Sequence, residues 1–212
     1  MGGYRRGKTD SGDMDFILSH PDENITQNFI GHLLDILTDS GWVLHELTVS
    51  YRGSGRKQET LAWRGADGRR KPGSGFDTLD HAFVVWRNPG TPPKAKEKAK
   101  AKDAGDGGND EEEGDLEYPY RRVDIIISPW KTAGCAVLGW TGGTLFERDL
   151  RSYCRNVKGW KFDSSGVRSR RTGEEVLLEG PEGVDGTPEE AEKMVFRGLG
   201  LEFVPPDMRV TY

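Results

Sequence analysis

The 212-residue sequence has little cysteine and no long apolar run. Its two cysteines, Cys135 and Cys154, have none of the paired spacings of zinc motifs, which favours a reduced, intracellular protein. No apolar stretch approaches the length of a membrane span, and the N-terminus has no signal-peptide core. We therefore expect a soluble protein of the cytosol or nucleus that has no membrane partner.

The net charge of -5 arises from one segment of the chain. Residues 94–117 hold five lysines and nine acidic residues; removing them from the 30 basic and 35 acidic residues of the chain leaves 25 and 26. Because such a segment cannot bury apolar surface, we expect a disordered, charged insert at 88–117. Its KAKEKAKAK run resembles a nuclear localisation signal, although short lysine runs are common in disordered inserts.

Hydrophobic periodicity predicts an α+β fold. Short apolar or alternating runs predict strands at 14–19, 42–49, 82–87 and 120–128, and a twisted hairpin at 160–178. Helical spacing and capping residues predict helices at 24–40, 133–140, 145–157 and from Thr187 to about Gly198–Gly200. The segment 52–80 is rich in glycine and basic residues, and we interpret it as a long, mobile, mostly basic loop.

Three aspartates form the first candidate site. Asp13 and Asp15 begin a strand two residues apart, so both side chains lie on one face. Asp124 lies in the middle of an apolar strand, where an unpaired carboxylate is costly. Strand alternation predicts that its side chain points to the same side as that of Ile126 and away from that of Ile125. Three carboxylates on two neighbouring strands could hold two Mg²⁺ ions about 4 Å apart, an arrangement that suits in-line phosphoryl transfer. The alternative for Asp13 and Asp15 is a solvated turn that caps a strand.

A glycine-rich basic segment precedes the first two aspartates. Its sequence is GGYRRGK, in which glycines open a helical turn that carries three basic side chains. Free backbone N–H groups at such a turn bind phosphate oxygens, and Arg6 could bind a phosphate through two nitrogens. The alternative is an exposed basic loop without a ligand.

Four blocks of the sequence resemble the family X DNA polymerases. GGYRRGKTDSGDMDFILSHP resembles the catalytic palm of that family, and RRVDIIISP resembles the strand that bears its third catalytic aspartate. GWTGGTLFERDLRSYCR resembles the nucleotide-binding turn with its helix, and FRGLGLEFVPPDMR resembles the C-terminal ending. The resemblance implies a nucleotidyltransferase-type palm at 1–138, a mixed β-sheet with two helices on one face. A small α+β nucleotide- and template-binding subdomain would follow at 139–212.

The resemblance also implies roles for individual residues. Asp13 and Asp15 would bind both Mg²⁺ ions, with Mn²⁺ as a substitute. Asp124 would bind the catalytic ion, and Arg122 would orient the carboxylates. Arg148 and Arg151 would touch the template or the nascent base pair. His81 could reach the primer, although a half-exposed histidine without that role is the alternative. The expected nucleotide-binding residues, with a cis peptide at the double-glycine turn, are Gly3, Arg6, Ser11, Gly12, Gly139, Trp140, Gly142 and Gly143.

The pair Gly139-Trp140 is the pattern of the polymerase mu and terminal transferase branch of that family. Glycine removes bulk next to the sugar 2′ position, so we expect weak discrimination against ribonucleotides. The resemblance thus implies a nuclear, template-directed or template-tolerant polymerase that extends primer 3′-hydroxyls at broken DNA ends, in non-homologous end joining. The alternatives are a gap-filling base-excision-repair polymerase, another nucleotidyltransferase such as a poly(A) or CCA-adding enzyme, and a non-catalytic DNA-end-binding fragment.

The family normally places DNA-gripping subdomains upstream of the palm. This sequence begins almost at the glycine-rich basic segment, so we expect a fragment of a longer polymerase. Such a fragment would bind gapped DNA weakly and extend primers poorly. End-joining proteins would be recruited through the upstream domains.

Overall fold

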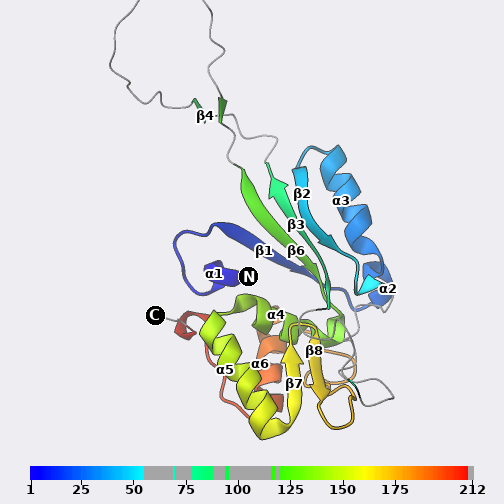
Figure 1. The fold of residues 1–212 in the computed structure, drawn as a ribbon, viewed down its shortest axis with the longest axis vertical. Helices are drawn as coiled ribbons and strands as arrows, with labels where there is room; N and C mark the ends of the chain where they lie inside the picture. The colour runs from blue at the N-terminus through cyan, green and yellow to red at the C-terminus, as the bar shows by residue number, and fades with distance from the viewer. Residues whose placement is uncertain (55–68, 70–77, 88–93, 96–115, 118–119, 210–212) are drawn as a thin grey trace, which may run out of the picture.

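The computed structural model describes residues 1–54, 69, 78–87, 94–95, 116–117 and 120–209. The elements form two groups, a four-stranded sheet with its helices and a second group of helices with a two-stranded hairpin (Figure 1). We call these the sheet region, residues 1–130, and the helical region, residues 131–209. The short helix α1 (Gly2–Arg5) lies between them (Figure 1).

The sheet is mixed, as predicted. Its strand order is β1-β6-β3-β2, with β1 parallel to β6 and the other two pairs antiparallel. The strands are β1 (Asp13–Leu18), β2 (Val43–Ser50), β3 (Asp80–Trp86) and β6 (Arg121–Ile127). All four lie close to predicted strands, and the central β6 carries the most apolar segment.

The two faces of the sheet have different partners. Ile125 and its alternate neighbours pack with the helix α3 (Phe29–Asp39) in one apolar cluster. Ile126 points to the opposite face and packs with Ala136 of α4 (Ala133–Thr141). Because strand side chains alternate, Asp124 shares the face of Ile126. The α+β class and the alternation predicted for this strand are confirmed.

The predicted helix at 24–40 is two helices. They are α2 (Glu23–Thr26) and α3, and Asn28 between them has a left-handed conformation with φ of 56°. A residue in that conformation interrupts the helical hydrogen bonds, and asparagine tolerates it better than most residues. The apolar stripe of 29–37 was predicted correctly, whereas this local break was not.

The predicted loop at 52–80 is wrong for its last residue, Asp80. Asp80 already belongs to β3 and is fully buried, and its carboxylate accepts hydrogen bonds from the backbone N–H of Gly53 at 2.5 Å and of Ser54 at 3.1 Å. The Thr78 hydroxyl donates to Ser165 Oγ of the helical region at 3.1 Å. Both ends are therefore fixed by buried polar contacts. Residues 55–68 and 70–77 lie outside the described residues.

The predicted disordered insert contains one short ladder. The strands β4 (Lys94–Ala95) and β5 (Leu116–Glu117) pair antiparallel, with Lys94 opposite Glu117. The prediction of disorder is therefore wrong for these four residues. The prediction for 88–93 and 96–115 lies outside the described residues.

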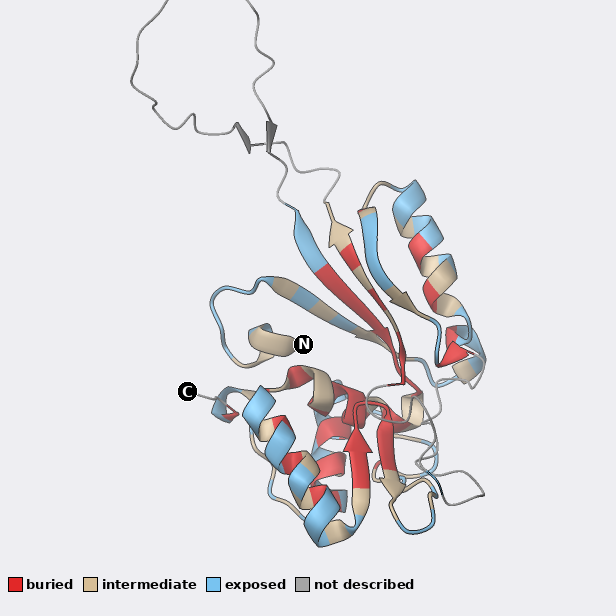
Figure 2. Ribbon diagram, in the orientation of Figure 1, coloured by how far each residue is buried: buried red, intermediate tan, exposed pale blue. Residues whose placement is uncertain are grey.

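The helical region has its own apolar core around α4, α6 and the hairpin, and it contains Cys135 and Cys154, both buried and free. Figure 2 shows this core as buried segments that face inward on each helix. The predicted helix at 145–157 ends in a π-helical turn. The elements after α4 are α5 (Thr144–Tyr153), η3 (Cys154–Lys158), β7 (Trp160–Asp163), β8 (Gly166–Ser169), α6 (Pro188–Leu199) and η4 (Pro206–Met208), and η2 (Trp130–Thr132) precedes α4.

Two helices of this region begin at identifiable caps. The predicted capping box starts α6: Thr187 Oγ1 accepts from the Glu190 N–H at 3.2 Å, and the Thr187 N–H donates to Glu190 Oε2 at 2.7 Å. At the start of α4, the buried Glu179 carboxylate accepts from the N–H of Gly134 at 2.7 Å and of Cys135 at 3.0 Å.

The predicted boundary between residues 138 and 139 would fall inside α4, and it stays a prediction. Among the described residues, no helix is both long and apolar enough to cross a membrane.

Candidate active site

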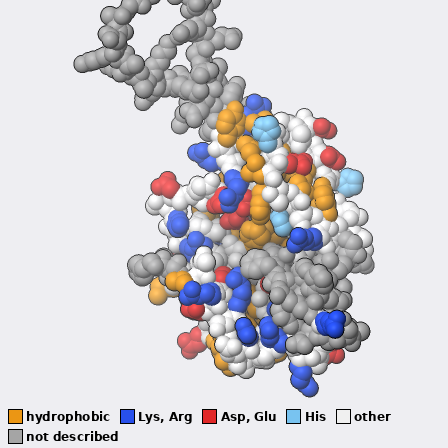
Figure 3. All heavy atoms as spheres, viewed as in Figure 1, with side chains coloured by type: hydrophobic (Ala, Val, Ile, Leu, Met, Phe, Trp, Pro, Cys, Tyr) orange, Lys and Arg blue, Asp and Glu red, His pale blue; other side chains and the backbone are white. Residues whose placement is uncertain are grey.

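The parallel pairing of β1 with β6 places three carboxylates on one face of the sheet. Asp15 lies directly opposite Asp124, and Asp13 lies opposite Arg122. The Asp124 side chain is 4% exposed, whereas that of Asp13 is 34% exposed. Figure 3 shows acidic and basic side chains side by side over the sheet. The three aspartates predicted to form one site therefore share one surface, although they come from distant parts of the chain.

Arg122 bridges two of these carboxylates. Its Nε donates to Asp124 Oδ1 at 2.9 Å, and its Nη2 donates to Asp13 Oδ2. The predicted role of Arg122 in orienting the carboxylates stays a prediction. Within the described residues, no three His, Cys, Asp or Glu side chains are arranged to hold a metal ion. The Arg122 guanidinium lies where a cation would join Asp13 to Asp124.

The electrostatics of the three carboxylates favour an added positive charge. Burial raises the pKa of Asp15, and the neighbouring charges of Asp13 and Asp124 raise it further. Burial also raises the pKa of Asp124, against the opposing effect of its hydrogen bond from Arg122. One guanidinium thus faces three carboxylates. Carboxylate oxygens are the ligands that Mg²⁺ prefers, so Asp13, Asp15 and Asp124 fit a divalent cation and would be the residues that hold it.

The glycine-rich basic segment lies against the carboxylates. Gly2, with φ of 51°, lies so close to the Asp15 carboxylate that a side chain there would collide with it. The N-terminal amine donates to the Asp15 carbonyl at 2.6 Å. Ser11 Oγ donates to the Asp13 carbonyl at 2.7 Å, and Gly12 is exposed with open space beside it. Gly3 lies within α1. Phosphate binding by Gly3, Ser11 and Gly12 stays a prediction.

Two arginines tie this segment to the double-glycine turn. Arg6 Nη1 donates to the carbonyl of Thr141, and Arg5 Nη1 donates to Thr141 Oγ1 at 2.6 Å. Thr141 is the last residue of α4 and directly precedes Gly142-Gly143, whose peptide bond is cis, as predicted. The predicted phosphate-binding and sugar-binding segments are therefore in contact.

Trp140 faces the same side of the sheet as the carboxylates. Its ring makes an edge contact with Phe83 at 6.4 Å between centroids, and Phe83 lies opposite Asp124. Gly139 has a packing reason of its own, since a Cβ there would lie 2.8 Å from Ser164 Cβ in the β7–β8 turn. The absence of a side chain lets α4 approach that turn closely. The predicted contact of Gly139 with a sugar stays a prediction.

The three predicted DNA-contacting residues lie on two elements, His81 on β3 and the two arginines on α5. His81 is half-buried on the carboxylate face, where its ring stacks on Phe83 at 5.0 Å and its Nδ1 lies 3.1 Å from the Leu79 carbonyl. Arg148 and Arg151 are on α5, beyond the double-glycine turn. Arg148 is well exposed, and Arg151 Nη2 donates to Glu147 Oε2 at 3.1 Å.

The sequence reasoning missed a buried charged network. Glu192 of α6 accepts from Arg5 Nη2 at 3.0 Å and from Arg209 Nη1 at 2.6 Å. The side chains of Glu192 and Arg209 are fully buried, and the rings of Phe146, Phe196 and Phe203 surround the Arg209 guanidinium at 5.2–5.6 Å. The signal was present, because Glu192 falls on the otherwise apolar stripe of its helix.

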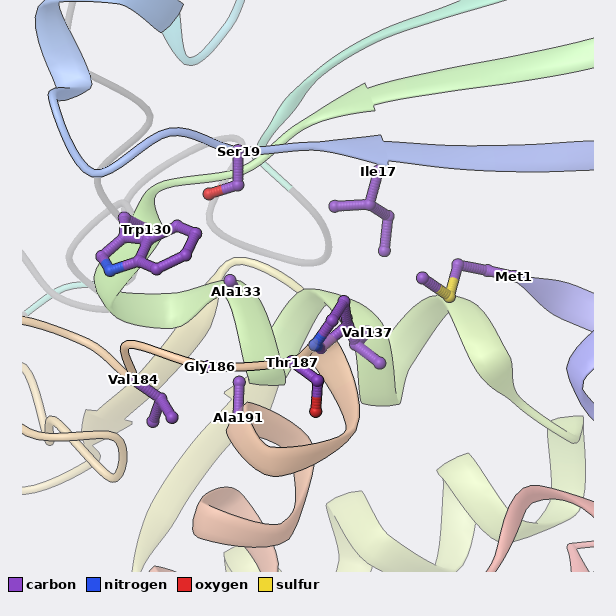
Figure 4. Close-up of a pocket in the computed structure, with 11 residues that line it drawn as sticks. Met1, Ile17, Ser19, Trp130, Ala133, Val137, Val184, Gly186, Thr187 and Ala191 are labelled. Atoms are coloured by element: carbon purple, nitrogen blue, oxygen red, sulfur yellow. The ribbon is translucent and has the colours of Figure 1, made fainter.

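A separate cavity of about 150 Å³ lies between the two regions (Figure 4). Ser19 Oγ is buried and without a hydrogen-bond partner among the described residues, and it lies beside this otherwise mostly apolar space. The lining residues are Met1, Ile17, Ser19, Trp130, Ala133, Val137, Val184, Gly186, Thr187, Pro188 and Ala191.

Comparison with protein families accounts for both regions. The family model "DNA polymerase beta palm" matches residues 1–130, and "DNA polymerase beta thumb" matches residues 136–210. This chain belongs to the family X DNA polymerases. The resemblance and the palm fold predicted from the sequence are confirmed.

Family X relatives are similar over the whole chain. This chain is 29% identical over 208 residues to human "DNA-directed DNA/RNA polymerase mu", and the match covers 98% of this chain and 35% of that protein. It is 30% identical over 212 residues to the Schizosaccharomyces pombe "DNA polymerase type-X family protein pol4", covering 100% of this chain and 32% of that protein. Rat "DNA polymerase lambda" is 28% identical over 213 residues, covering 98% of this chain and 28% of that protein. The chain thus spans about a third of the length of these relatives.

Proposed function

We propose that this chain is the catalytic part of a DNA polymerase that adds nucleotides to a primer 3′-hydroxyl by two-metal phosphoryl transfer. The observation that carries the proposal is the register that sets Asp15 opposite Asp124, with Asp13 on the same face. These three carboxylates would hold two Mg²⁺ ions, with Mn²⁺ as a substitute. When bound, the ions activate the attacking hydroxyl and neutralise the charge that develops on the triphosphate.

The chain's own residues would position the substrates. Arg6 lies at the double-glycine turn, where its guanidinium donates to the Thr141 carbonyl. It would exchange this carbonyl for a phosphate of the incoming nucleotide. Arg5 is paired with the buried Glu192, so Arg6 is the better candidate of the two adjacent arginines for a phosphate contact. Arg122 would hold Asp13 and Asp124 in place until the metals bind. Trp140 lies on the carboxylate face, where it could contact the incoming nucleotide.

We further propose that the enzyme accepts both dNTPs and NTPs, tolerates an imperfect template, and acts at broken DNA ends in non-homologous end joining. Gly139-Trp140 supports this assignment, as does similarity to the human relative whose name includes both DNA and RNA. End-joining proteins would bind through domains of a longer polymerase, and the site of action would be the nucleus.

The test is single-turnover primer extension by the 212-residue chain in Mg²⁺. Gapped, blunt and non-complementary DNA ends are each supplied with dNTPs and NTPs in parallel, and we expect slow but measurable extension on all three. Asp124→Ala should reduce the rate on the order of 10³-fold or more while the circular dichroism spectrum is unchanged.

Three outcomes would count against parts of this proposal. A folded chain that extends none of the ends overturns the polymerase assignment. Extension of gapped DNA alone favours gap filling over end joining. Full activity of Asp124→Ala contradicts the two-metal site.

A further inference from the structure

A stripe of basic side chains follows the outer face of α5 and the π-helical turn after it. Arg148, Arg151, Arg155 and Lys158 recur at helical spacings of three, four and three residues. Figure 3 shows basic side chains gathered over the lower half of the visible face, where α5, β7 and β8 lie. A basic stripe on a helix is the usual footprint of a protein that contacts the phosphate backbone of nucleic acid.

One member of the stripe, Arg151, forms an ion pair with a buried carboxylate. Arg151 Nη2 donates to Glu147 Oε2 at 3.1 Å, one helical turn away. The Arg151 side chain is 35% exposed, whereas the Glu147 side chain is 4% exposed. Asp149, on the same helix, is 77% exposed and lies 3.8 Å from Arg148. An exposed pair of that kind contributes little, whereas the Glu147 charge depends on its partner.

Glu147 is incompletely satisfied even in this pair. Its Oε1 atom is buried and has no hydrogen-bond partner among the described residues. A buried carboxylate oxygen without a donor costs free energy. The other groups that face it are Arg209 near the C-terminus, Glu192 on α6 and Cys154 at the start of the π-helical turn. Burial raises the pKa of Glu147 to about 7, while Arg151 and Arg209 oppose that rise. Near neutral pH, Glu147 can therefore lose Arg151 by binding a proton.

We propose that Glu147 is a positioning residue for the DNA contact made by Arg151. In the free protein Glu147 holds Arg151 against α5, and Arg151 leaves it for a phosphate when DNA binds. A DNA phosphate competes well, because it accepts hydrogen bonds from a guanidinium through two oxygens at once. As Arg151 leaves, Glu147 takes up one proton from solvent, so no unpaired charge stays buried. This inference rests on the proposed function in one respect, namely that DNA is the ligand.

The test measures binding of a fluorescein-labelled duplex with a one-nucleotide gap by fluorescence anisotropy. Glu147→Gln should tighten binding roughly three- to tenfold, because Arg151 no longer has to leave an anion. Arg151→Ala should weaken binding and lower the slope of log affinity against log salt by about 0.9, the effect of one lost phosphate contact. In the Arg151→Ala background, Glu147→Gln should have almost no effect.

Asp149→Asn is the matched control, since it removes the same charge from an exposed position on the same helix. We expect it to change the affinity less than about twofold. A second measurement needs no variant: wild-type affinity should fall as the pH rises from about 7, because DNA binding then requires proton uptake by Glu147. Glu147→Gln should remove that component of the pH dependence.

Several results would overturn the inference. If Glu147→Gln has the same effect with and without Arg151, or no larger an effect than Asp149→Asn, Glu147 acts only as a general negative charge. If Arg151→Ala binds DNA as the wild type does, Arg151 is not a contact. DNA binding that lacks this coupling overturns the inference alone, whereas a folded chain that binds no DNA overturns it together with the proposed function.

Discussion

The chain contains two groups of charged side chains that are built in opposite ways. On the palm sheet, Asp13, Asp15 and Asp124 face one guanidinium, and the group is partly open to solvent. In the thumb, Glu192 lies between two arginines, and both Glu192 and Arg209 are fully buried. The first group has an excess of negative charge that an incoming cation can neutralise. The second is closed, because two guanidinium groups share one carboxylate and the Glu192–Arg209 pair is fully buried, so it holds the architecture together.

Removing one charge from each group tests the contrast between them and should have the largest effect. Glu192→Gln should destabilise the fold by roughly 3–5 kcal/mol, because it leaves Arg209 buried without its ion-pair partner. Asp13→Asn should change stability by less than about 1 kcal/mol, since that pair is partly exposed. Urea unfolding followed by tryptophan fluorescence measures both. Equal losses for the two variants would contradict the contrast between a closed group and an open one.

A second buried thumb carboxylate should make stability depend on pH. Burial raises the pKa of Glu179 to about 7 from 4.5, although two backbone N–H groups oppose the shift. The folded pKa lies above the unfolded value, so the contribution of Glu179 is fully present below pH 4.5 and is lost as the pH rises to about 7. Over that interval the free energy of unfolding should fall by about 3 kcal/mol.

Unfolding free energies of wild type and Glu179→Gln, measured from pH 4 to pH 8, check this prediction. The Gln variant should show a flatter profile. Identical profiles would mean that the N–H groups at the start of α4 keep Glu179 ionised in the folded state.

The smallest expected effect is at Gly139, on the helix that joins the two groups. Gly139→Ala should cost about 1–3 kcal/mol, because the added methyl group would collide with Ser164. Adding Ser164→Gly should restore part of the loss. Thermal unfolding measures stability, and extension rates with NTPs and dNTPs measure sugar discrimination. If Gly139 also faces the sugar, the double variant will regain stability and still reject NTPs; if it accepts them, packing is the only role of this glycine.

The sequence predicted features that depend on short-range pattern. Alternation in β6 assigned Asp124 to the same face as Ile126, and the capping box located the start of α6. The strands that bear Asp15 and Asp124 were expected to be neighbours because three carboxylates there suit two Mg²⁺ ions, and β1 does pair with β6. Periodicity could not reveal the break at Asn28, because it depends on one residue's backbone conformation rather than on the apolar stripe.

The sequence predicted the three aspartates of the candidate site but not the buried network of residues beside it. Arg5, Thr141, Glu192 and Arg209 meet through contacts between residues up to 187 positions apart, which no local pattern encodes. The buried end of the predicted loop was missed for the same reason, since the Asp80 carboxylate accepts a hydrogen bond from Ser54, which is 26 residues away in the sequence. Hydrogen bonds and ion pairs between residues far apart in the sequence are therefore the part of the fold that is hardest to predict from the sequence.

The parallel partnership of β1 and β6 has a consequence for how the protein is made. Asp13 and the residue that bridges it, Arg122, are separated by 109 positions. At a synthesis rate of about 5–20 residues per second, Asp13 would be added to the chain roughly 5–20 seconds before Arg122. During that interval the first strand has no neighbour to pair with in the sheet. The three carboxylates therefore share one face of the sheet only after β6 has been synthesised.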